Sequence, residues 1–167
     1  LNVAGEYVYD GALYACQNDD AKQRRSKRAV WGMAAILTVA VAAGGCIPAP
    51  GMQNCFYVLL PYLGEFLGAA SVIWALAKLG TDWSTVREYN YKKSVAVLPV
   101  RTAVTAVFSL LGIVCELIFF FVNDHAGQTF FALLYVLLKL IALLSVLVLR
   151  AEIMQAEWGK LPKKNNS

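Results

Sequence analysis

The chain has 167 residues, of which 59% are hydrophobic and only 16% are charged, and its formal net charge is +4. Water-soluble domains carry roughly 25% charged residues, so this composition argues against a protein that folds in water. No sequence motif of a nucleic-acid-binding fold accompanies the modest positive charge, and we therefore expect no nucleic-acid partner.

Hydrophobic residues gather in four long runs, at about residues 29–48, 55–79, 95–122 and 129–150. Each run reaches the roughly 20 residues that a helix needs to cross a bilayer, and a helix satisfies its backbone groups without water. The sequence therefore predicts an all-α integral membrane protein: a four-helix transmembrane bundle with short outer loops. We expect a multi-pass protein of a plasma membrane of bacterial type, surrounded by the lipid bilayer.

The distribution of lysine and arginine predicts which side of the membrane each segment occupies. Apart from Lys139, all of them lie before the first run, around the connection between the second and third runs, or from Arg150 onward. The positive-inside rule places these segments, and both termini, in the cytoplasm. The chain then divides into a cytoplasmic segment of residues 1–28, a transmembrane domain of residues 29–150 and a cytoplasmic tail of residues 151–167.

The N-terminal segment contains an alternating stretch, EYVYDGALYAC, around the pair Asp10-Gly11. Asp-Gly favours the type I′ turn of a two-residue hairpin, so we expect a small β-hairpin over residues 6–16, followed by a basic linker. A lone hairpin is marginally stable in water and would have to pack against the bundle, a second copy or another protein. A partly ordered tail is the alternative.

The connection between the second and third runs, TDWSTVREYNYKK, mixes aromatic and charged residues. Thr85 and Glu88 have the spacing of a capping box. We expect a short amphipathic helix here, lying at the cytoplasmic interface.

Two cysteines, Cys46 and Cys55, flank the first outer loop. If the helix ends approach each other in an oxidising compartment, this pair can close a structural disulfide. No Cys-x-x-Cys pair favours thiol redox chemistry. The single His125 has no second ligand at a useful spacing, so we expect neither a metal site nor a cofactor.

Three ionisable residues, Glu65, Glu116 and Lys139, lie well inside the hydrophobic runs. Counted at ~1.5 Å per residue, all three fall in the outer half of the bilayer. An unpaired charge in lipid costs ~2.5–3.5 kcal/mol, so we expect Lys139 to be paired. Because helical side chains lean toward the helix N-terminus, Glu116 is the first candidate partner and Glu65 the second.

Small and polar residues recur at helical spacing and predict the inward faces of the helices. In the third run they are Thr102, Thr105, Ser109, Gly112 and Glu116, and in the fourth run Gln128, Ala132, Tyr135, Lys139, Ala142 and Val146. In the second run, Gly64-x-x-x-Gly68 permits close approach of two helices. The predicted polar cluster consists of Glu65, Glu116, Lys139, Tyr135, Tyr62 and Ser109, with Gly64, Gly68 and Gly112 as packing positions.

One carboxyl group remains after Lys139 is paired, and its role separates two functions. If it is protonated and hydrogen-bonded to Tyr62 or Tyr135, the cluster only fixes helix packing. This predicts a non-enzymatic accessory or assembly subunit that associates with itself or with another membrane subunit. If the carboxyl group titrates in a cavity open to the outside, the chain is instead a small oligomeric proton-coupled transporter. No nucleophile–base pair, metal cluster or phosphate loop indicates an enzyme, and we assign no catalytic residue.

Overall fold

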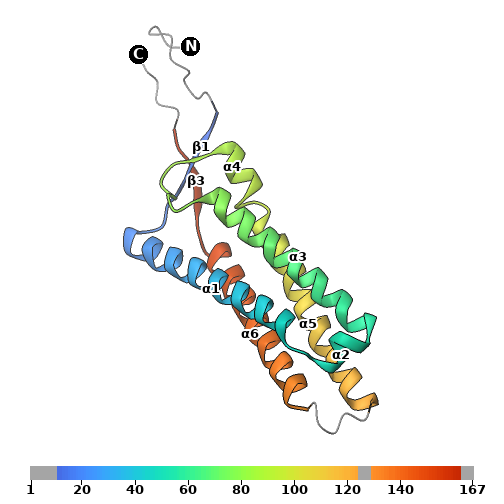
Figure 1. Cartoon of the computed structure of the whole chain (residues 1–167). Helices are drawn as coiled ribbons and strands as arrows, with labels where there is room; N and C mark the ends of the chain where they lie inside the picture. The colour runs from blue at the N-terminus through green and yellow to red at the C-terminus, as the bar shows by residue number, and fades with distance from the viewer. Residues whose placement is uncertain (1–10, 124–128, 163–167) are drawn as a thin grey trace.

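A computed structural model of the chain describes residues 11–123 and 129–162. In this part the chain forms helices α1 (Asp20–Cys46), α2 (Pro50–Asn54), α3 (Phe56–Leu79), α4 (Glu88–Lys93), α5 (Leu98–Val122) and α6 (Thr129–Met154), and strands β1 (Leu13–Cys16), β2 (Val86–Arg87) and β3 (Trp158–Lys160) (Figure 1). The four helices α1, α3, α5 and α6 are long and apolar enough to cross a membrane. The prediction of a mostly helical chain with four such helices is confirmed.

Helices α1 and α6 are longer than the hydrophobic runs that predicted them. Helix α1 begins at Asp20 rather than near residue 29, because the residues before the run are mostly Ala, Lys, Gln and Arg, which favour helix. Helix α6 continues past Arg150 to Met154. In these two helices the hydrophobic run marks only the apolar part and underestimates the length.

The four long helices form a bundle in which α5 packs between α3 and α6, and α1 packs mainly against α6. Two glycines set the approach of α3 to α5. A Cβ atom at Gly64 would lie 2.5 Å from Cδ1 of Phe108, and one at Gly68 would lie 2.6 Å from Oγ1 of Thr105. Both distances are too short for any side chain, so the Gly-x-x-x-Gly face provides the close contact.

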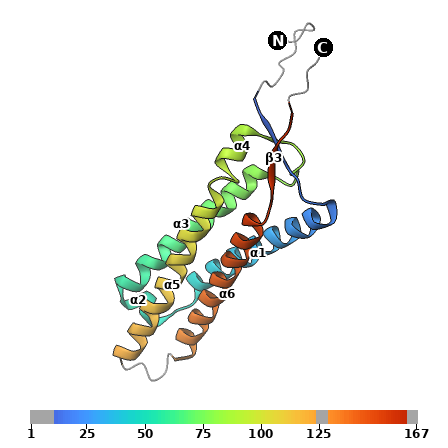
Figure 2. The ribbon, with the colours of Figure 1, turned by 180° about the vertical axis from the view of Figure 1, so that it is seen from behind.

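A three-stranded antiparallel sheet with the order β2-β1-β3 lies at one end of the bundle, here called the sheet end (Figure 2). Tyr14 in β1 is paired with Val86 on one side and with Lys160 on the other. The sheet thus joins the N-terminal segment, the connection between α3 and α5, and the C-terminal segment. These are the three segments in which the basic residues gather. Helix α2 lies at the opposite end, here called the α2 end (Figure 1).

One local prediction at the sheet end needs correction, and another lies partly outside the described residues. Residues 6–10 of the expected hairpin lie outside the described residues, and the other half is β1, whose two edges are both occupied by β2 and β3. The predicted capping box is wrong, because pairing with β1 keeps residues 86 and 87 extended and the N-cap of α4 is Arg87. The hydroxyl of Thr85 instead donates to Oδ2 of Asp82, at 3.3 Å.

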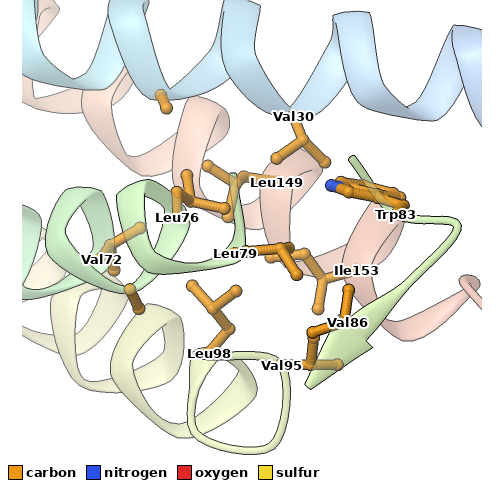
Figure 3. Close-up of a cluster of buried hydrophobic side chains, with 12 residues drawn as sticks. Val30, Val72, Leu76, Leu79, Trp83, Val86, Val95, Leu98, Leu149 and Ile153 are labelled. Atoms are coloured by element: carbon orange, nitrogen blue, oxygen red, sulfur yellow. The ribbon is translucent and has the colours of Figure 1, made fainter. Parts of the chain in front are cut away.

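A hydrophobic cluster lies beneath the sheet and attaches it to the helices (Figure 3). Trp83 is only 2% exposed, and its ring centroid lies 5.7 Å from that of Trp158. Figure 3 shows Trp83 beside Val30 of α1, with Leu149 of α6 nearby. Gly80 makes the turn that leads to Trp83, because its φ of 69° lies in the left-handed region where glycine alone is unstrained. The sheet is therefore packed on the bundle rather than tethered to it.

Candidate functional site

The interior of the bundle contains an ion pair between Lys139 of α6 and Glu65 of α3. The two side chains are 1% and 0% exposed, respectively. Ser109 of α5 donates a hydrogen bond from its hydroxyl to Oε1 of Glu65, at 2.6 Å, while Nζ of Lys139 donates to Oε2. Both oxygens of the Glu65 carboxylate are therefore satisfied, and three helices are joined through it.

Two tyrosine rings surround the ammonium group of Lys139. Its Nζ atom lies 4.5 Å from the ring centroid of Tyr62 and 5.1 Å from that of Tyr135. Contacts of this kind stabilise a cation by about 0.5–2 kcal/mol. The hydroxyl of Tyr62 also donates to the carbonyl oxygen of Val41, at 3.4 Å. Because Val41 lies in α1, the cluster contacts all four long helices.

The prediction that Glu116 pairs with Lys139 is wrong. The second candidate, Glu65, forms the ion pair. The physical reason is axial position. Ser109 contacts Glu65, whereas Glu116 follows Ser109 by seven residues on α5, about 10 Å farther toward the α2 end. Tyr135 lies one turn before Lys139 on α6, also toward the α2 end, and is fully buried. Counting residues from the helix ends placed Glu116 too close to the lysine.

The structure leaves Glu116, not Glu65, as the second buried carboxyl group. Glu116 is 0% exposed, and neither of its carboxyl oxygens has a hydrogen-bond partner among the described residues. The backbone N–H of Gly51 lies near the carboxyl group of Glu116, but the two do not have the geometry of a hydrogen bond. The hydroxyl of Tyr135 is also buried without a partner in the described part of the chain.

The inward faces expected on α5 and α6 are the faces that the structure buries. Every predicted position on α5, from Thr102 to Glu116, is buried, as are the described positions on α6 from Ala132 to Val146. Gln128 lies outside the described residues. Gly112 lies beside the lysine stem, and a Cβ atom there would make an ordinary van der Waals contact, at 3.7 Å from Cε of Lys139.

The predicted disulfide is absent from the described residues, where Cys46 and Cys55 are both free. Cys46 ends α1, and Cys55 caps α3, with the unexpected helix α2 between them. The connection is thus a folded segment rather than a simple loop. His125 lies outside the described residues, and within them no group of three or more His, Cys, Asp or Glu side chains could hold a metal ion.

At the sheet end, Glu88 connects α4 to the N-terminal segment. Its Oε1 atom accepts a hydrogen bond from Nζ of Lys92 at 2.7 Å, and its Oε2 atom accepts one from the backbone N–H of Ala12 at 3.4 Å. The hydrogen bond from Lys92, and then that from Ala12, lower the pKa of Glu88 below its ordinary value. This carboxylate is charged and paired in the fold, and it faces solvent.

Comparison of the chain with models of protein families, with curated proteins and with solved structures gave no match. We therefore describe the protein by its fold and its buried polar cluster. It is a bundle of four apolar helices with an internal ion pair and a small capping sheet.

Proposed function

We propose that the chain is a multi-pass membrane protein in which α1, α3, α5 and α6 cross the bilayer. Large apolar side chains on the outward faces support this, among them Val39, Leu67, Leu133 and Val107, which are 67%, 67%, 60% and 56% exposed. Such surfaces suit lipid and would aggregate in water.

The sheet end faces the cytoplasm in this proposal. The basic residues gather there, and Arg24, Arg25 and Arg28 line one surface beside the start of α1. The positive-inside rule assigns such a cluster to the cytoplasmic side. Because the sheet contains strands from three segments, all three share that side.

Within the membrane, we propose that the protein is a non-enzymatic accessory or assembly subunit. The observation that supports this role best is the burial of the Glu65–Lys139 pair, at 0% and 1% exposed. A pair enclosed in this way contacts no substrate and instead fixes how the helices pack. Lipid provides no hydrophobic force between helices, so polar contacts and close packing determine their arrangement. The partner is a second copy or another membrane subunit, contacted through the lipid-facing helices or the sheet end.

Purification from native membranes with a mild detergent, followed by mass spectrometry, tests the subunit role. We expect a stoichiometric membrane partner or a defined homo-oligomer. The matched variant Lys139→Met, which disturbs helix packing, should lose that complex, whereas the surface variant Lys92→Met should retain it. Recovery of the chain as a monomer that binds no other chain would contradict the subunit role.

Transport is the second candidate, and the unpartnered carboxyl group of Glu116 is the observation that favours it. An intramembrane carboxyl group that gains and loses a proton can be coupled to the movement of a cation or amine. The chain would have to act as an oligomer, because four helices are few for a transporter protomer. Liposomes that contain the purified chain and an imposed pH gradient would show flux of an amine if this is correct. The flux would be lost in Glu116→Gln.

A further inference from the structure

The α2 end of the bundle contains two buried polar groups that the packing role does not use. These are the carboxyl group of Glu116 on α5 and the hydroxyl group of Tyr135 on α6, and no described residue makes a hydrogen bond to either. Both residues are 0% exposed. A buried polar group without a partner is costly to maintain, so such groups indicate either a ligand or a protonated acid.

Helix α2 covers this pair of groups. Gly51, in its first turn, is buried, and its backbone lies against the carboxyl group. A Cβ atom at Gly51 would collide with Oε2 of Glu116 and would lie 3.0 Å from its Cδ and 3.1 Å from Cδ1 of Phe119. Helix α2 also contacts α3 and α6. It is a five-residue segment between two longer helices at this end of the bundle (Figure 1). Through Gly51 it lies against Glu116.

The charges around Glu116 indicate which ligand it binds. Among the described residues, Tyr135 of α6 and Tyr57 of α3 are titratable groups of the neighbouring helices that lie near it. Deeper in the bundle, Glu65 and Lys139 neutralise each other. An ionised Glu116 would therefore be an unpaired buried charge among the described residues. A metal cation needs several oxygen ligands, and no group of three or more ligating side chains is found in the described part. A proton needs only the carboxyl group.

We propose that Glu116 is a proton-binding site that α2 covers. With α2 closed, the side chain is a neutral carboxylic acid. When α2 moves away, the O–H bond of that acid breaks, the carboxylate retains the electron pair, and the proton passes to water at the α2 end. The inference rests on the proposed membrane location of α5, and it is independent of the packing role of the Glu65–Lys139 pair.

Carbodiimide labelling of the reconstituted protein tests this site. Dicyclohexylcarbodiimide is apolar and reacts with protonated carboxyl groups in lipid, whereas a water-soluble carbodiimide reacts with exposed ones. We expect the apolar reagent to modify Glu116 and not Glu65, and the water-soluble reagent to modify the exposed Glu157 and not Glu116. Glu116→Gln should lose the apolar label, as measured by peptide mass spectrometry. No label on Glu116, a label on Glu65, or protection of Glu116 by sodium ions at constant pH would overturn the proposal.

The covering role of α2 is tested with Gly51→Ala, which adds a methyl group against the Glu116 carboxyl group. Its matched control is Gly32→Ala, where a Cβ atom meets nothing within 4 Å. We expect Glu116 to react with the water-soluble reagent in Gly51→Ala but not in Gly32→Ala. Equal protection of Glu116 in both variants would overturn the covering role. If Gly51→Ala does not fold, the labelling of the native chain decides, because fast reaction of its Glu116 with the water-soluble reagent excludes a cover.

A photoactivated apolar probe separates this test from the membrane proposal. If the probe labels the outward face of α5 while dicyclohexylcarbodiimide leaves Glu116 unmodified, only the proton site fails. If the probe labels no long helix, the membrane location fails as well.

Discussion

Replacement of Lys139 by methionine is the perturbation with the most direct consequence for this fold. Methionine is similar in length to lysine and fills the space between the Tyr62 and Tyr135 rings, but it removes the charge. Glu65 would then remain 0% exposed, with Ser109 as its only hydrogen-bond donor among the described residues. Removing one partner of a buried ion pair destabilises a protein by about 3–5 kcal/mol. We expect about 3 kcal/mol, the lower end of this range, because methionine keeps the packing between the two rings.

The reciprocal variant, Glu65→Gln, keeps an acceptor for Ser109 but leaves the ammonium group with two aromatic rings as its neighbours. We expect it to cost a similar amount, about 3 kcal/mol. The double variant contains no unpaired charge, so it should cost about as much as either single variant. The coupling energy between the two positions is then about 3 kcal/mol, at the upper end of values for residues in contact.

Reversible unfolding of the four proteins in mixed micelles, followed by tryptophan fluorescence, measures this cycle. The surface pair Lys92–Glu88 is the matched control, because it has the same chemistry at side-chain exposures of 67% and 34%. Lys92→Met and Glu88→Gln should leave the free energy of unfolding almost unchanged at neutral pH. If the losses at Lys139 and Glu65 simply add, the two side chains do not act as a pair.

Three further predictions concern other parts of the fold. Gly68→Ala should destabilise the bundle by about 1–3 kcal/mol, since its Cβ atom overlaps α5, and Gly32→Ala should not; thermal unfolding in detergent measures both. Trp83→Ala should cost about 3–5 kcal/mol and should raise hydrogen exchange in β1 if the cluster attaches the sheet to the helices. Acid should weaken the contact of Glu88 with the N-terminal segment. Because the folded pKa of Glu88 is lowered, its contribution is present above the unfolded pKa and is lost as pH falls through the folded pKa. A lower protection factor of the Ala12 amide in that range, absent from Glu88→Gln, would report this loss.

The helices and their buried faces could be predicted from the sequence because both are properties of one segment. A run of apolar residues identifies each long helix, and the spacing of Thr102, Ser109 and Glu116 identifies the face of α5 that is buried in the bundle. Polar residues in an apolar helix have few favourable places other than the interior of a bundle.

The sheet and α2 could not be predicted in the same way. Strands of two to four residues carry little local signal, and β1 is defined by partners far along the chain, at Val86 and Trp158. Helix α2 has five residues and only a proline at its first position as a sign of its start. The choice between Glu65 and Glu116 as the partner of Lys139 depends on how far the helices are shifted along their axes relative to one another, by about one to two turns. Residue counts along separate helices do not define these shifts.

The protonation state of Lys139 in the reconstituted protein shows whether the Glu65–Lys139 pair is an enclosed packing element. Solid-state NMR of the ¹⁵N-labelled lysine side chain distinguishes an ammonium group from an amine, and it detects water in contact with the nitrogen. We expect an ammonium group close to the carboxylate carbon of Glu65, without water contact and with slow exchange in D₂O. A neutral amine, or an ammonium group in contact with exchanging water, would contradict the assignment of this pair as an enclosed packing element.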